Sequence, residues 1–139
     1  MPGDAQGERR SEPKEGASTP DRTPMSLADT TQVALATAMR GAWMRQTLIT
    51  NNIANANTPG YQRETLNFQG ALRAALAAGS SPEAVPLQPE VQPGSANPEG
   101  NGVSIDQEAA QLSENGLEYE AIVQVMGTRN EILRTAMGA

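Results

Sequence analysis

The sequence predicts a mainly α-helical protein in which long N- and C-terminal helices pair as an antiparallel coiled coil. The middle segment is expected to be irregular and partly extended, and the N-terminal extension is expected to be disordered. Two observations carry this prediction. The ten prolines leave two long intervals free, 25–58 and 99–139, and proline is poorly tolerated inside helices. Both intervals also carry apolar residues at alternating spacings of four and three, which is the pattern of a heptad seam.

Residues 1–24 differ from the rest of the chain in composition. Prolines and charged residues recur in this segment, while large apolar side chains are nearly absent. Such a segment buries too little apolar surface to offset the entropy of ordering its backbone. We therefore expect a disordered extension over 1–24.

The N-terminal helix is predicted over 25–58. Ser26 can cap its free N–H groups, and Asp29 stands three residues later, where a capping box places an acid. Thr58 precedes Pro59 and is disfavoured in the helical region, so the helix should end there. The apolar seam of this helix consists of Leu35, Met39, Ala42, Ile49 and Ile53.

The middle of the chain divides into two segments. Residues 59–78 contain a Pro-Gly turn, an extended stretch over 61–68 and an Ala/Leu-rich short helix over 71–78. Residues 79–102 are rich in proline and glycine and are predicted to form a long irregular linker. Loops of this length are uncommon inside compact domains unless they are functional.

The C-terminal helix is predicted over 103–139, with Ser104 and Gln107 as its capping box. Its seam keeps the four-three spacing through the whole segment and includes Ile105, Ala109, Leu112, Tyr119, Val123, Met126 and Leu133. A second apolar stripe beside the seam is formed by Ile122, Val125 and Ile132. One partner helix is too little to cover both stripes, so we expect other copies of the chain or partner proteins to cover the remainder.

The composition excludes several classes of function. The chain has a formal net charge of −6 and contains neither His nor Cys. Metal or haem ligation through these residues, thiol chemistry and imidazole catalysis are therefore excluded. The acidic charge disfavours an electrostatic nucleic-acid interface, and no segment approaches the ~18 apolar residues of a membrane span. We expect no catalytic, cofactor or metal site, no nucleic-acid partner and no membrane span.

Carboxylates are concentrated in the C-terminal helix, outside its predicted seam. They are Asp106, Glu108, Glu114, Glu118 and Glu120. Charged residues at such positions normally form solvated faces or pair between subunits. We expect that role here in preference to a catalytic pair, so the chain is predicted not to be an enzyme.

The most specific motif stands at the predicted end of the first helix, where residues 51–61 read NNIANANTPGY. Asparagine side chains can satisfy free backbone groups at a helix end, and a Pro-Gly pair suits a tight turn with positive φ at Gly60. On local physics alone, the motif is a helix terminator followed by a turn. Its residues are Asn51, Asn52, Ala54, Asn55, Asn57, Thr58, Pro59, Gly60 and Tyr61.

As a string, this motif resembles the signature of the flagellar rod, hook and hook-associated axial proteins, and Gln62-Arg63 continues the match. The segment 101–119, NGVSIDQEAAQLSENGLEY, is similar to the start of the last helix in proximal rod members of that family. The resemblance covers about residues 26–78 and 99–137.

The resemblance implies a structural subunit of the proximal rod, in the periplasmic part of the flagellar basal body. Its terminal helices would self-assemble into the shaft that transmits torque. The partners implied are further copies of the chain, adjacent FlgC-like rod proteins, a FliE-like adaptor and the flagellar type III export apparatus. Export would proceed without a cleaved signal peptide. Family members usually begin close to the first helix, so residues 1–24 are either an added extension or follow from a misassigned start codon, with Met25 as the true start.

Three alternatives stay open on the residues alone. The chain could be another flagellar rod subunit, FlgC-like, or a non-flagellar coiled-coil adaptor that shares the heptads. A secreted helical effector or chaperone-like protein is compatible with the acidic charge. Generic heptads, however, would not explain the NTPGY turn.

Overall fold

The computed structural model describes residues 26–93 and 102–138. These residues are mainly helical, as the sequence predicts, and the long helices lie near the two ends of the chain. In order, the elements are α1 (Leu27–Ala54), β1 (Glu64–Thr65), α2 (Phe68–Ala77), the 3-10 helix η1 (Pro82–Ala84), β2 (Glu90–Val91) and α3 (Ile105–Ala136). The extension predicted over 1–24 and the linker residues 94–101 lie outside the described part of the chain.

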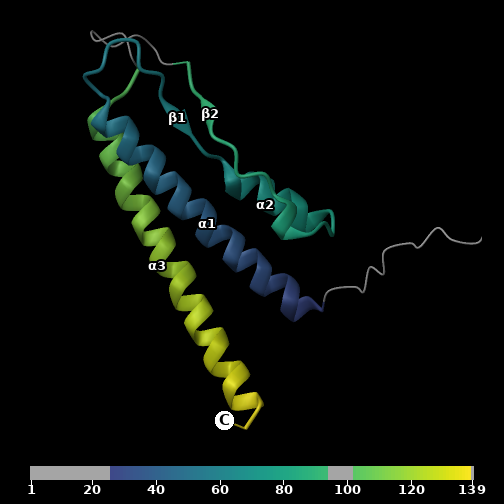
Figure 1. Cartoon of the computed structure of the whole chain (residues 1–139). Helices are drawn as coiled ribbons and strands as arrows, with labels where there is room; N and C mark the ends of the chain where they lie inside the picture. The colour runs from purple at the N-terminus through teal and green to yellow at the C-terminus, as the bar shows by residue number, and fades with distance from the viewer. Residues whose placement is uncertain (1–25, 94–101, 139) are drawn as a thin grey trace, which may run out of the picture.

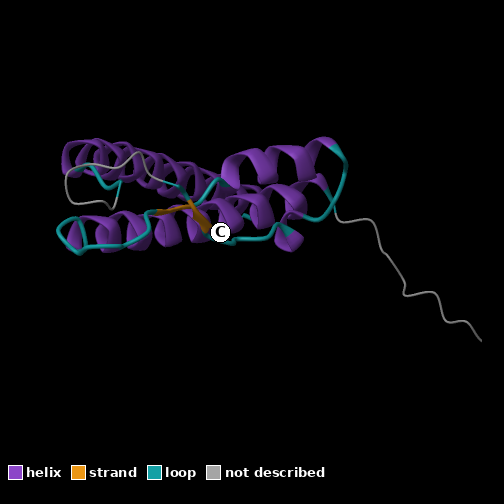
Figure 2. Ribbon diagram, turned by 90° about the horizontal axis from the view of Figure 1, so that it is seen from above, coloured by secondary structure: helices purple, strands orange, loops and turns teal. Residues whose placement is uncertain are grey.

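The two long helices run antiparallel and side by side (Figure 1). They lie close together where α1 ends and α3 begins, and they separate toward the other end of the pair. α1 is the central element, because it contacts α3, α2, η1 and β1. The two short strands form only a small ribbon beside the helices (Figure 2). The fold is therefore a helix pair with a compact middle segment packed on α1.

Both long helices begin at the caps that the sequence predicts. The Ser26 hydroxyl accepts a hydrogen bond from the N–H of Asp29 at 3.2 Å, and the Ser104 hydroxyl accepts one from the N–H of Gln107 at 3.4 Å. Each cap satisfies one of the N–H groups that the first helical turn leaves unpaired. The two serines therefore position the helix starts.

α1 ends at Ala54, before the end predicted near residue 58. The Asn55 side chain donates to the carbonyl oxygen of Asn51 at 2.9 Å, and the N–H of Thr58 donates to the carbonyl oxygen of Asn55 at 2.9 Å. These bonds occupy the backbone groups that further helical turns would use. The chain consequently leaves the helix before it reaches Pro59.

The middle segment is more ordered than its composition suggests. β1 pairs antiparallel with β2, so that Glu64 lies opposite Val91, and the N–H of Gln92 donates to the carbonyl oxygen of Arg63 at 2.9 Å. Residues 90–92 belong to the segment that was predicted to be an irregular linker. Here long-range pairing supplies the hydrogen bonds that a Pro-rich segment cannot form locally.

α2 begins at Phe68, three residues before the predicted start at Ala71. The Asn67 side chain accepts from the N–H of Gly70 at 3.4 Å and caps the helix. The expected helix is therefore present, and its cap decides where it begins.

The hydrophobic core is small and lies mainly between α1 and the middle segment. It consists of Ala42, Leu48, Leu66 and Phe68, with Ala38, Met44, Leu87 and Ile122 packed against it. Phe68 is fully buried, and its ring lies so close to α1 that a Cβ on Gly41 would stand 2.5 Å from ring carbons. Ile122 is the α3 member of this cluster. Apolar packing therefore holds the middle segment against α1 more firmly than it holds α3 against α1.

The contact between Gly41 and Phe68 leads to a prediction. We expect Gly41→Ala to lower the free energy of unfolding by about 1–3 kcal/mol, because the added methyl group must displace a buried ring. Gly127→Ala is the matched control: a Cβ there meets nothing within 4 Å, and alanine is the better helix former by up to about 1 kcal/mol. Urea unfolding followed by circular dichroism measures both. Equal effects of the two substitutions would contradict the packing.

Candidate functional site

The motif of residues 51–61 forms the end of α1 and the turn that follows. The N–H of Tyr61 donates to the carbonyl oxygen of Thr58 at 3.2 Å and closes a four-residue turn. Gly60 has φ +73°, which confirms the positive φ predicted for it. The exposed members of the motif are Asn51, Ala54, Asn57, Thr58, Pro59 and Gly60, whereas Asn52 is fully buried.

The buried Asn52 side chain makes four hydrogen bonds, the full number that its amide offers. Its Nδ2 donates to the carbonyl oxygen of Glu64 at 2.8 Å and to Oε2 of Glu108 at 3.0 Å. Its Oδ1 accepts from the hydroxyl of Tyr61 and from the N–H of Glu64, each at 3.1 Å. One side chain thus joins the end of α1, the strand after the turn and the first turns of α3.

Glu108 is the acidic centre of this arrangement and is 0% exposed. Its Oε1 accepts from Nε of Arg63 at 2.6 Å, and the same guanidinium donates to Oε1 of Gln111 at 3.1 Å. A buried carboxylate is costly unless it is paired and hydrogen-bonded. Both conditions are met here. We call Asn52, Tyr61, Arg63 and Glu108 the polar clamp.

The surroundings of Tyr61 in the clamp shift the pKa of its phenol. Burial raises the pKa of its phenol above the ordinary value, and the carboxylates of Glu64 and Glu108 raise this pKa further. The phenol therefore stays protonated and donates to Asn52.

A second polar cluster lies further along the helix pair. Arg45 of α1 forms an ion pair of 2.8 Å with Glu118 of α3 and donates to the side chain of Gln69 at 2.7 Å. Gln69 in turn donates to Glu118 at 2.6 Å, and the Arg45 guanidinium lies 4.6 Å from the centre of the Phe68 ring. This cluster connects α1, α2 and α3.

Four of the α3 residues that pack toward α1 recur at intervals of seven. Glu108 and Asn115 are the buried residues of α3, Ile122 packs against the core, and Arg129 donates to the carbonyl oxygen of Ala28. Asn115 Nδ2 donates to the carbonyl oxygen of Ala42 and to the side chain of Gln46, each at 3.0 Å. The pairing within the chain therefore uses a partly polar stripe that lies beside the predicted apolar seam.

The expectation that the α3 carboxylates form solvated faces or pair between subunits is wrong for two of them. Glu108 and Glu118 are bound to arginines of the same chain. Sequence reasoning also did not single out Arg45, Arg63 and Asn115 for these contacts. The seven-residue interval from Glu108 to Asn115 is the signal that could have identified the stripe, but a polar residue at that spacing is normally read as solvent-facing.

The residues of the predicted assembly seam have two different environments. On α1, Ala42 and Ile49 are buried, and Leu35, Met39 and Ile53 are half-buried. On α3, Leu112 and Met126 are half-buried, while Ile105, Ala109, Tyr119, Val123 and Leu133 are exposed. The seam is thus covered on one helix and mostly uncovered on the other, and its role in assembly stays a prediction.

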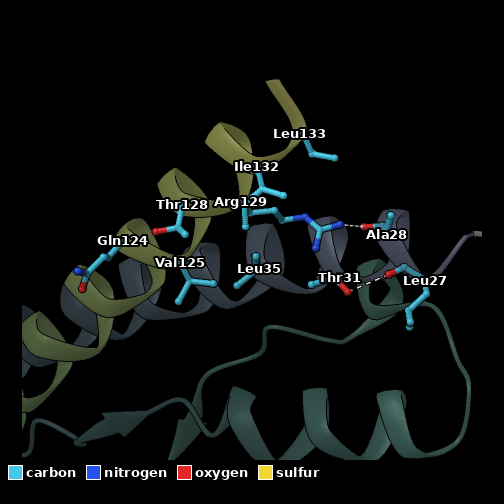
Figure 3. A pocket seen from close by; sticks show the side chains of 10 residues that line it. All are labelled: Leu27, Ala28, Thr31, Leu35, Gln124, Val125, Thr128, Arg129, Ile132 and Leu133. Carbon is cyan, nitrogen blue, oxygen red and sulfur yellow. Dashed lines mark hydrogen bonds between the residues drawn. The ribbon is translucent and has the colours of Figure 1, made fainter. Parts of the chain in front are cut away.

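An open, largely apolar groove of about 740 Å³ lies where the two helices separate (Figure 3). It runs between the first turns of α1 and the last third of α3. Its apolar lining consists of Leu27, Ala28, Leu35, Val125, Ile132 and Leu133. The Arg129 side chain crosses the groove to the backbone of Ala28.

The described part of the chain holds no cluster of three or more acidic side chains arranged to bind a metal ion. Nor does it contain a helix with the length and apolar character needed to cross a membrane. The candidate site consists of the polar clamp, which joins the helices, and the apolar side chains that α3 exposes.

The buried hydrogen bonds of the polar clamp lead to a testable prediction. We expect Asn52→Asp to lower the free energy of unfolding by about 3 kcal/mol or more, because a second negative charge would face the Glu108 carboxylate and two donated hydrogen bonds would be lost. Asn51→Asp makes the same chemical change on the neighbouring exposed residue and serves as the control. Thermal unfolding measures both variants. A similar small effect of both would contradict the buried network.

Comparison with known proteins is consistent with this architecture. A family model described as "Flagella basal body rod protein" matches residues 32–62, which span most of α1 and the whole NNIANANTPGY motif. The matched region includes Asn52 and Tyr61 of the polar clamp.

Individual relatives match more of the chain, and each bears the name flagellar basal body rod protein FlgB. The protein from Bacillus subtilis strain 168 is 31% identical over 128 residues, which cover 81% of this chain and 97% of the relative. The protein from Salmonella typhimurium strain LT2 is 30% identical over 105 residues, or 61% of this chain and 76% of the relative. The protein from Escherichia coli strain K12 is 31% identical over 96 residues, or 55% and 70%. On these matches, the chain belongs to the flagellar basal body rod protein family.

Proposed function

We propose that this chain is a subunit of the proximal rod that self-assembles through α1 and α3 and helps to form the shaft that transmits torque. Membership of the family gives the chain a structural role in the flagellar rod. The observation that carries the further proposal is the amount of apolar surface that α3 exposes.

Large apolar side chains are exposed along the whole length of α3 and at its C-cap, Met137. They are Ile105, Leu117, Tyr119, Val123, Val125, Ile132, Leu133 and Met137. Soluble monomers rarely expose contiguous apolar surface on this scale, and a helix that is apolar on several sides is typical of one enclosed by several neighbours. The side chains that α3 buries within its own chain, Glu108 and Asn115, are instead polar. Assembly with further subunits would bury the apolar ones.

The apolar groove supports the same interpretation. At the separated end of the helix pair, Ile132 of α3 and Leu27 of α1 are exposed on either side of an open space. A helix from another subunit would fill this space and cover both residues. The clamp at the opposite end holds α1 and α3 together while leaving this end open.

The family places the chain in the flagellar basal body, among other basal body components. We propose that its direct neighbours are further copies of the chain, FlgC-like rod proteins and a FliE-like adaptor. We also propose that it occupies the periplasmic part of the rod and is delivered by the flagellar type III export apparatus without a cleaved signal peptide.

We propose no catalytic activity for this chain, in keeping with the structural family to which it belongs. Of the five carboxylates concentrated on α3, Glu108 and Glu118 are held in ion pairs with Arg63 and Arg45, which supports a structural role for these two.

Leu133 provides the test of assembly. It is 43% exposed and lines the groove, so Leu133→Asp should change the stability of the isolated chain little but place a charge where a neighbouring helix would pack. We expect a strain that carries only this variant to lose swimming and rod formation. Motility on soft agar and isolation of basal bodies are the measurements.

Thr135→Asp introduces the same charge two residues away, at an exposed position outside the groove, and should leave swimming intact. Normal swimming of the Leu133→Asp strain would contradict assembly through α3. Normal swimming of a strain from which the gene is cleanly deleted would overturn the rod assignment altogether.

A further inference from the structure

A second pocket opens midway along the helix pair, apart from both the apolar groove and the polar clamp. Its volume is about 310 Å³. Trp43 and Gln46 of α1 line one side of it, and Asn115, Gly116, Tyr119 and Glu120 of α3 line the other. We call it the Trp43 pocket. None of the structural contacts described above requires it to be open.

Two aromatic side chains face solvent at this pocket. Trp43 is 65% exposed and Tyr119 is 38% exposed, although the whole chain has only four aromatic residues. Neither residue belongs to the hydrophobic core. Exposed tryptophan and tyrosine beside a pocket are typical of the residues that dominate protein interfaces, and the face of an indole ring attracts cations.

One charged group of the pocket has no partner. Glu120 is exposed and takes part in no ion pair within residues 26–93 and 102–138. The two amides of the lining are bonded to each other, because Asn115 Nδ2 donates to Gln46 Oε1 at 3.0 Å. The pocket therefore combines an unpaired negative charge with an aromatic face, and its lining includes no positive charge.

Gly116 keeps the pocket open. A Cβ at this position would meet nothing within 4 Å, so the packing of the chain itself does not require glycine there. Glycine is also among the least favourable residues inside a helix. Gly116 therefore leaves this part of the pocket wall without a side chain.

We propose that the Trp43 pocket receives an arginine side chain from a neighbouring protein subunit. The guanidinium would stack on Trp43 and pair with the Glu120 carboxylate. Arginine fits better than lysine because its planar group offers five N–H donors and stacks on aromatic rings. This inference rests on the proposed assembly of the chain with other subunits and assigns one contact within it.

The chemistry of the pocket can be tested on the full-length chain in solution. Trp43 is the only tryptophan, so its fluorescence reports directly on the pocket. We expect Nα-acetylarginine amide to change this fluorescence saturably, with a dissociation constant on the order of a few millimolar. Nα-acetylcitrulline amide, which has the same shape without the charge, should bind at least about fivefold more weakly.

Two variants locate the binding. Gly116→Leu fills the pocket and should weaken binding by about fivefold or more. Glu120→Gln removes the charge of an exposed side chain and should weaken binding by about two- to fivefold. Gly127→Leu makes the same change as Gly116→Leu at another open glycine of α3 and should bind like the wild type. A non-saturating response, or equal binding by Gly116→Leu and Gly127→Leu, would overturn the proposal.

The same glycine pair tests the contact in cells. In a strain lacking its own copy of the gene, the wild type and Gly127→Leu should restore swimming, and Gly116→Leu should not, although circular dichroism should show both variants to be folded. If the wild type restores swimming and Gly116→Leu does so equally, the arginine pocket is refuted while the rod function stands. If the deletion strain swims without any copy, the rod function itself fails.

Discussion

The four hydrogen bonds of Asn52 are the constraint on which the rest of the structure depends. They join the end of α1, the segment after the turn and the start of α3 through one buried amide, and they place Glu108 against Arg63. Buried polar groups of this kind add little net stability compared with apolar packing, but an unsatisfied one is costly. In this arrangement of the three segments, every donor and acceptor of the Asn52 amide has a partner.

This constraint explains why α1 and α3 are so unlike each other. α1 packs the core on Phe68 and Leu66 and also receives the polar contacts of α3. α3 contributes mainly polar groups and Ile122, so its alignment is set by hydrogen bonds while most of its apolar side chains stay exposed. Under the proposed assembly, this division leaves the exposed apolar surface of α3 available for contacts between subunits.

Much of the local structure followed from short-range rules. Ser26 and Ser104 cap the helices that their positions predict, and Gly60 has the positive φ that a Pro-Gly turn requires. The bounds were less accurate, because Asn55 ends α1 early and Asn67 begins α2 early through side-chain bonds. The pairing of residues 90–91 with 64–65 was not foreseen, since nothing in a Pro-rich segment indicates its distant partner.

By itself, the sequence determined the helical class, the caps, the turn and the resemblance to axial proteins, because periodicity and local motifs act over a few residues. The tertiary structure alone decided that Asn52 is buried, that Glu108 pairs with Arg63, and that α3 meets α1 through the stripe of Glu108, Asn115 and Ile122. Two adjacent stripes along a helix are offset from each other by one residue. Composition alone predicts that the more apolar stripe faces the partner helix. The stripe of α3 that faces α1 is set by the partners of Glu108, which lie 45 and 56 residues away along the chain. No local sequence pattern specifies partners at that distance.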